Sequence, residues 1–179
     1  MTGRMLIAGV GNIFLGDDGF GVEVASRLAT VSLPDWVRVA DYGISGMHLA
    51  YDLAEGFETT ILVDASPRGE QPGTVYVMEL DTGRDRAGGG GIPLFDGHGM
   101  QPDVVLGMLD VLGADAGRVV LVGCEPASTE PGMGLSAPVA AAVDEAVRIV
   151  HGLVRTAEAA GFRGQAAGSG GQAVAERGR

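Results

Sequence analysis

The segment "MLIAGVGNIFLGDDGFG" (residues 5–21) decides how the chain begins to fold. An apolar run leads into a glycine-rich turn and two adjacent aspartates, an order that predicts a buried strand, a tight turn and the start of a helix. A dinucleotide-binding turn has three glycines, but here Gly9 and Gly11 are followed by Phe14 at the third position. The two aspartates would also repel a pyrophosphate at the helix N-terminus. We therefore expect this turn to present a carboxylate rather than to hold a phosphate.

The two aspartates, Asp17 and Asp18, have different expected roles. An acidic side chain before a helix caps its free N–H groups and complements its dipole, which stabilises the helix by roughly 0.5–2 kcal/mol. Only one of two adjacent residues can be the cap. We expect Asp17 to cap the following helix and Asp18 to face a cleft.

Short β-branched segments alternate with longer helical patterns, as in a three-layer α/β domain. The predicted strands are 5–9, 37–41, 60–64, 73–79 and 118–123. Helical spacing of apolar residues predicts helices around 20–28, 47–54, 105–112 and 139–150. The strands other than 73–79 are nearly continuous apolar runs, which is typical of strands covered on both faces.

The strand at 73–79 follows its predecessor too closely for a crossover helix, so it is expected to run antiparallel. The other strands then end at one common edge of the sheet. In open α/β sheets, binding sites lie at this edge, where the winding direction reverses.

Length and charge limit the possible partners. The 179 residues suffice for one domain, predicted over 1–160, and the Gly-, Gln- and Ala-rich segment 161–179 is predicted to be disordered. With 12 basic and 23 acidic residues the net charge is −11, which argues against nucleic acid and anionic membrane partners. The single cysteine, Cys124, excludes an intramolecular disulfide, and no apolar run approaches the ~20 residues of a membrane span. We expect a cytoplasmic protein.

Four side chains that can carry chemistry are expected at the common edge: Asp18, Asp41, Asp64 and His98. Asp64 also fits a turn residue that binds local amides, and His98 also fits an exposed loop residue without a role. Two carboxylates and an imidazole together, however, form a mixed oxygen and nitrogen ligand set that suits nickel, zinc or iron(II). The three side chains together indicate a metal site more specifically than any one of them does alone.

Other residues with reactive side chains have simpler interpretations. His48 and His151 lie within predicted helices and are interpreted as structural. Cys124 could be a thiol nucleophile acting with His98, but its acidic neighbours would raise the pKa of the thiol. We interpret Cys124 as a small buried apolar residue.

The segments "GVGNIFLGDDGFGV" (9–22), "DYGISGMHL" (41–49), "ILVDA" (61–65) and "DGHGMQPDVVL" (96–106) together resemble the hydrogenase maturation endopeptidases. The resemblance covers roughly residues 4–155. It implies an α/β/α, phosphorylase/hydrolase-like fold with a mixed five-stranded sheet of order 2-1-3-5-4, in which the fourth strand is antiparallel.

By motif position, the resemblance implies that Asp18, Asp64 and His98 bind nickel and carry catalysis. The implied reaction removes a C-terminal extension from the precursor of the nickel-iron hydrogenase large subunit once nickel has been inserted. The nickel would arrive with the substrate, so no permanent cofactor is expected. Asp41 and Gly43 are candidates for substrate recognition.

This chain departs from the family pattern at two positions. Tyr42 stands where glycine is expected, and Glu125 stands before Pro126 where glutamine is common. Both departures leave the implied ligand set intact but affect the expected substrate contacts.

The same residues are compatible with three other functions. A protein that binds the hydrogenase subunit without cleaving it would share every motif. A nucleotide-binding module would share the glycine turn, and so would a peptidyl-tRNA hydrolase, although the charge of −11 argues against a polyanionic substrate. For hydrolysis, activation of water by the metal and general-base catalysis by a carboxylate both remain open.

Overall fold

A computed structural model describes residues 4–80 and 117–162. Their centre is one five-stranded sheet of order β2-β1-β3-β5-β4. The strands are β1 (Met5–Val10), β2 (Val37–Gly43), β3 (Thr59–Ala65), β4 (Val75–Leu80) and β5 (Arg118–Cys124). The first three strands and β5 run parallel, and β4 is antiparallel to β5. The predicted order and the predicted direction of β4 are confirmed.

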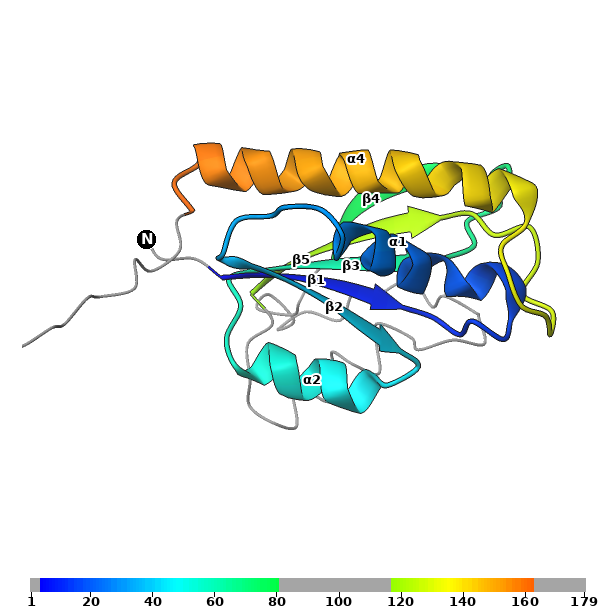
Figure 1. The fold of residues 1–179 in the computed structure, drawn as a ribbon, viewed down its shortest axis with the longest axis horizontal. Coiled ribbons are helices and arrows are strands. Elements are labelled where there is room, and N and C mark those ends of the chain that lie inside the picture. Colours follow the sequence, from blue (N-terminus) through cyan, green and yellow to red (C-terminus); the bar gives the residue numbers. More distant parts are fainter. Residues whose placement is uncertain (1–3, 81–116, 163–179) are drawn as a thin grey trace, which may run out of the picture.

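Helices cover both faces of the sheet (Figure 1). They are α1 (Phe20–Leu28), α2 (Gly46–Ala54) and α4 (Ala137–Ala159). Helices α1 and α4 pack on one face and α2 packs on the other (Figure 1). The result is the three-layer arrangement that the alternating pattern predicts.

The core has two parts, one on each side of the sheet. Alternate residues of a strand point to opposite faces, so Ile7 contributes to the α1/α4 side and Leu6 to the α2 side. Val143 and Val150 of α4 belong to the first part of the core. The apolar stripe at helical spacing is therefore the buried face of α4.

Strand β2 differs from the expectation of burial on both faces. All six residues of β1 are buried, whereas most of β2 is half-buried or exposed. The physical reason is position: β2 is an edge strand that pairs only with β1 in this sheet. An apolar run alone does not distinguish a central strand from an edge strand.

Glycines bring α1 unusually close to the start of the sheet. A side chain at Gly21 would collide with the carbonyl groups of Val10 and Val63, and one at Gly9 would collide with Gly21 itself. The absence of these side chains lets the start of α1 lie directly against β1 and β3. The short 3₁₀ helix before α1, Gly16–Gly19, carries both aspartates of the opening segment.

Some predictions concern residues outside the described ranges. They include the helix predicted at 105–112, His98 and all of the predicted tail except Gly161 and Phe162. Phe162 packs against Trp36, with ring centroids 5.8 Å apart. Within the described ranges, no helix is long and apolar enough to cross a membrane.

Candidate active site

Asp18 lies at the carboxyl end of β1 with its carboxylate held in place. Its Oδ2 accepts a hydrogen bond from the backbone N–H of Asn12 at 2.6 Å, and only 6% of the residue is exposed. Gly11 makes this turn possible, because it has a φ of +132° and a side chain there would collide with the Asp18 carbonyl. Burial raises the pKa of the Asp18 carboxyl, although the Asn12 bond opposes the shift. The glycine turn thus holds the Asp18 carboxylate against its own backbone, and the expectation that Asp18 faces a cleft stays a prediction.

Asp64 is the second-last residue of β3, the strand next to β1. Burial raises the pKa of its carboxyl well above the usual value, and the negative charge of Asp18 raises it further. The two carboxylates are therefore close enough to interact electrostatically in a poorly solvated place. A cation between them would relieve both the repulsion and the loss of hydration.

Asp17 does not cap α1, and this prediction is wrong. Its carboxylate accepts hydrogen bonds from the N–H groups of Ala127 and Ser128, at 2.7 and 3.1 Å, and from both the N–H and the hydroxyl of Ser136. Ser136 is the N-cap residue of α4, so Asp17 complements the dipole of α4 rather than that of α1. Burial alone would raise the pKa of the Asp17 carboxyl, but the hydrogen bonds outweigh it and lower the pKa.

Glu125 organises the loop that follows Asp64, a role that sequence reasoning missed. Its two carboxylate oxygens accept the backbone N–H groups of Arg68 and Gly69, at 2.6 and 3.3 Å. A glutamine side chain has one carbonyl oxygen, so it accepts fewer such bonds. The glutamate at position 125, where the resemblance leads us to expect glutamine, is therefore explained by the two N–H groups that it accepts.

Asp41 and Gly43 lie at the end of β2, beside the turn that carries Asp18. The Gly43 carbonyl accepts the N–H of Gly11 at 2.9 Å, and the exposed Asp41 carboxylate accepts the N–H of Gly43 at 2.8 Å. Gly43 has a φ of +51°. The two candidate recognition residues therefore shape one turn that is bonded directly to the glycine turn after β1.

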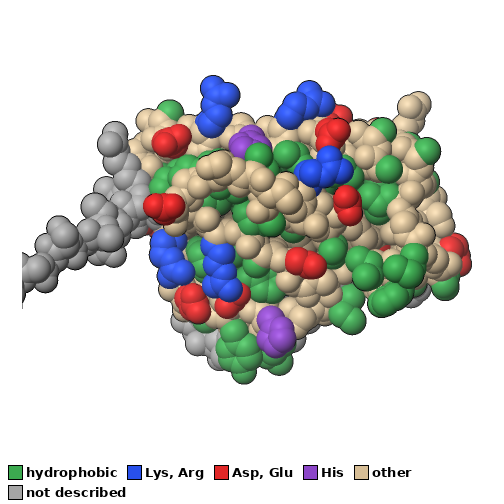
Figure 2. Space-filling view, viewed as in Figure 1, with side chains coloured by type: hydrophobic (Ala, Val, Ile, Leu, Met, Phe, Trp, Pro, Cys, Tyr) green, Lys and Arg blue, Asp and Glu red, His purple; other side chains and the backbone are tan. Residues whose placement is uncertain are grey.

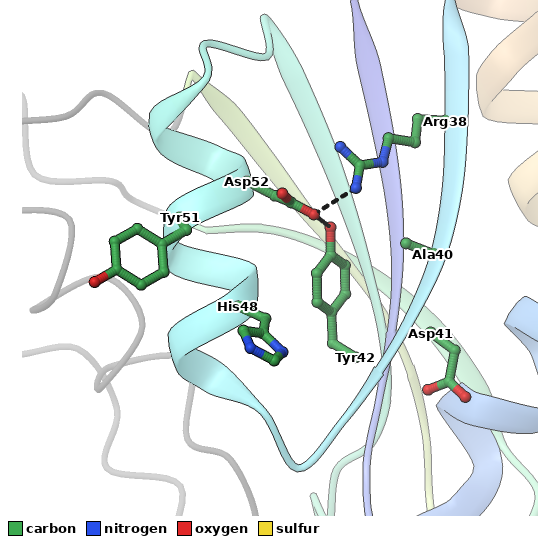
Figure 3. Close-up of a pocket in the computed structure, with 7 residues that line it drawn as sticks. All are labelled: Arg38, Ala40, Asp41, Tyr42, His48, Tyr51 and Asp52. Atoms are coloured by element: carbon green, nitrogen blue, oxygen red, sulfur yellow. Dashed lines mark hydrogen bonds and ion pairs between the residues drawn. The ribbon is translucent and has the colours of Figure 1, made fainter.

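Next to this turn lies a pocket of about 330 Å³ between β2 and α2 (Figure 3). Tyr42 points into it from β2 and donates its hydroxyl to Asp52 of α2 at 2.6 Å. Arg38 pairs with the same carboxylate oxygen at 2.7 Å. The tyrosine that replaces the family's glycine thus ties β2 to α2.

The remaining reactive side chains have the following positions. His48 is exposed on α2 and lines the pocket, so it is not a core residue. Cys124 is fully buried, and burial together with the charges of Asp17, Glu125 and Glu145 raises the pKa of its thiol to about 12. A thiol with such a pKa is not a nucleophile near neutrality. Within residues 4–80 and 117–162, no three potential metal ligands come together, and the predicted third ligand, His98, lies outside these ranges.

Comparison with known proteins identifies the family. A family model described as hydrogenase maturation protease matches residues 22–153. The chain belongs to the hydrogenase maturation protease family. It is 32% identical over 159 residues to the hydrogenase 2 maturation protease of Escherichia coli, an alignment that covers 85% of this chain and 91% of the relative.

Solved structures agree with this assignment. The hydrogenase maturating endopeptidase HybD from E. coli superposes with a TM-score of 0.71 at 30% identity, covering 86% of this chain and 93% of that one. A hydrogenase 2 maturation peptidase from a Thaumarchaeota archaeon gives a TM-score of 0.66 at 34% identity, over 85% and 98% of the two chains. This protease is therefore an endopeptidase, and the nucleotide-binding, peptidyl-tRNA hydrolase and non-catalytic alternatives are set aside.

Proposed function

We propose that this protease removes a C-terminal extension from the precursor of a nickel-iron hydrogenase large subunit after nickel insertion. The substrate-bound nickel is its recognition element. The observation that carries the proposal is the placement of two carboxylates at the same edge of the sheet: Asp18 in the 3₁₀ helix that follows β1, and Asp64 near the end of β3, the strand that pairs with β1. In a hydrogenase maturation protease, such a pair is suited to a metal that the substrate brings.

The metal belongs to the substrate in this proposal. Asp18 and Asp64 supply two oxygen ligands, and His98 is proposed as the nitrogen ligand that completes the set. Without nickel, burial first and the negative charge of Asp18 second raise the pKa of Asp64 and oppose ionisation of both carboxylates together, which is the repulsion that a cation would relieve. A precursor that lacks nickel leaves this repulsion in place, and this gives the enzyme a physical means of testing whether the precursor is loaded.

The same residues are proposed to carry the hydrolysis. A metal-polarised carbonyl or water lowers the barrier to attack on the scissile bond, and a carboxylate of raised pKa is a suitable proton acceptor. Asp64 has the more strongly raised pKa of the pair. The fixed Asn12 bond to Asp18 keeps that carboxylate oriented, which favours a positioning role for Asp18.

The partner and the compartment follow from this function. We propose the large-subunit precursor as the protein partner, with no nucleic acid partner in view of the net charge of −11. The single, buried Cys124 fits a reducing compartment, and we propose the cytoplasm.

The experiment compares nickel-loaded and nickel-free precursor as substrates of the purified chain. Intact-mass spectrometry should show loss of a C-terminal peptide from the loaded precursor only. Equal trimming of both precursors would overturn nickel recognition, and trimming of neither would overturn the proposed substrate. A zinc-loaded precursor is a useful control, because it separates a need for nickel from a need for any divalent ion.

A further inference from the structure

Exposed apolar side chains are concentrated at one edge of the molecule. Eight large apolar side chains are exposed among the described residues. Five of them follow the carboxyl ends of the parallel strands β1, β2 and β5: Ile13, Phe14, Ile44, Met47 and Met133. We call these five side chains the apolar rim. The space-filling view shows apolar side chains gathered at this end of the molecule (Figure 2).

Phe14 is the most informative member of the rim, because its side chain is exposed while its backbone is fixed. Its N–H donates to the side-chain Oδ1 of Asn12 at 3.0 Å, and its carbonyl accepts the N–H of Gly132 at 2.9 Å. Yet the residue is 62% exposed. A large apolar side chain on a preordered backbone loses little entropy on binding, which is a property of interface hot spots.

Met133 directly follows Gly132, whose backbone is bonded to Phe14. The N–H of Gly16 donates to the carbonyl of Gly132 at 2.8 Å, so the loop after β1 and the loop after β5 are bonded to each other in both directions. Asp17 anchors the second loop through Ala127 and Ser128. Met133, at 75% exposed, therefore lies on a loop that is bonded to the turn carrying Asp18.

The charge around the rim limits what can cover it. Three segments carry the rim: 11–16, 43–47 and 126–136. They contain no arginine or lysine, and Glu130 is their one acidic residue. Asp18, Asp41 and Asp64 lie next to these loops. The edge therefore suits a partner surface that is apolar and that carries positive charge toward the aspartates.

We propose that the apolar rim is the docking surface for the precursor protein, with Phe14 and Met133 contacting an apolar segment beside its cleavage site. This inference rests on the proposed function. It adds a second contact between enzyme and substrate: the rim binds the precursor protein, and the aspartates then bind its metal. The rim's contribution to affinity does not depend on nickel.

The test uses the full chain and the nickel-free precursor, which the enzyme is proposed to bind without cleaving. Affinity is measured by biolayer interferometry for wild type and for the double variant Phe14→Ser, Met133→Ser. The control is Val31→Ser, Val77→Ser, which removes two exposed apolar side chains, 42% and 47% exposed, that are not part of the rim. Melting curves establish that all three proteins are folded, and light scattering gives their oligomeric states.

The rim variant is expected to raise Kd for the nickel-free precursor at least tenfold, while the control stays within twofold of wild type. With loaded precursor, the rim variant should raise KM and leave kcat within twofold. An unchanged Kd in the rim variant, an equal loss in the control, or undetectable binding by wild type would overturn the docking surface. So would a wild-type dimer that the rim variant converts to a monomer, because the rim would then join two copies. Failure of the proposed function appears separately, as tight rim-dependent binding without trimming of loaded precursor.

Discussion

The carboxylate of Asp17 accepts the backbone N–H of Ser136 at 2.6 Å and the Ser136 hydroxyl at 2.8 Å. These bonds join the turn after β1 to the N-terminus of α4, across 119 residues of chain. The arrangement explains why two adjacent aspartates are needed. Asp17 fixes the surrounding loops, which leaves Asp18 available for the proposed site.

Asp17→Asn should destabilise the fold by about 3 kcal/mol, because an amide nitrogen would meet N–H groups that now donate to a buried carboxylate. Urea unfolding followed by circular dichroism measures the loss, and Asp35→Asn, at an exposed aspartate, is the matched control. The folded-state pKa of Asp17 is lowered, so its contribution is fully present above the unfolded-state pKa of about 3.9. It is lost as the pH falls through the lowered folded-state value. Equal stability of Asp17→Asn and wild type at pH 7 would contradict this role.

Asp64→Asn should stabilise the metal-free protein. The folded-state pKa of Asp64 is raised, so its ionisation destabilises the fold, and this penalty grows as the pH rises through the unfolded-state value toward the folded-state value. At pH 8 we expect a gain of about 1 kcal/mol, or roughly 2–4 °C in Tm, and a smaller gain at pH 4. Differential scanning calorimetry at both pH values measures it. A lower Tm for the variant at pH 8 would show that the Asp64 charge is compensated in the folded protein.

Cys124 should not react in the native protein. Its side chain is buried and the pKa of the thiol is raised to about 12, so iodoacetamide at pH 8 should label it only after unfolding. Cys124→Ala should keep the kcat of wild type. Rapid labelling of the folded chain, or loss of cleavage in a folded Cys124→Ala variant, would restore the thiol as a candidate nucleophile.

Tyr42→Phe should cost about 1–3 kcal/mol, because it removes a hydrogen bond to a carboxylate and leaves the ring in place. The bond to Asp52 joins β2 to α2, so the effect should disappear in an Asp52→Ala background, which has no side-chain acceptor for the hydroxyl. A double-mutant cycle by urea unfolding measures the coupling between the two residues. Additive effects would mean that the hydroxyl and the carboxylate contribute independently. Tyr51→Phe, at an exposed tyrosine of the same helix, is the control.

Much of the fold can be predicted from local patterns. The short connection after Asp64 predicts an antiparallel strand, and β4 does run antiparallel, beside β5. It begins at Val75 rather than at Gly73, which has a φ of +84° in the preceding turn. The number of residues between two strands indicates their relative direction, because a parallel pair needs a connection long enough for a crossover and an antiparallel pair does not. The strand order came instead from the family resemblance.

The errors concern contacts between distant segments. Nothing near Asp17 in the sequence indicates that its partners are Ala127, Ser128 and Ser136, so the sequence predicts a cap for the nearest helix instead. Glu125 likewise binds a loop 56 residues earlier. Hydrophobic periodicity reports which face of an element is buried, but a polar contact depends on the final arrangement of loops. The places of Asp18 and Asp64 in the chain are predictable, because Asp18 follows the parallel strand β1 and Asp64 lies near the end of the parallel strand β3.

The central claim is that Asp18, Asp64 and His98 act together on the nickel-loaded precursor. The most direct measurement is single-turnover trimming, followed by intact-mass spectrometry, for wild type and for Asp18→Asn, Asp64→Asn and His98→Ala, with Asp35→Asn as control. The account predicts that each of the three site variants, folded by its melting curve, loses trimming at least a hundredfold while the control keeps the wild-type rate. Trimming at the wild-type rate by any of the three would contradict it.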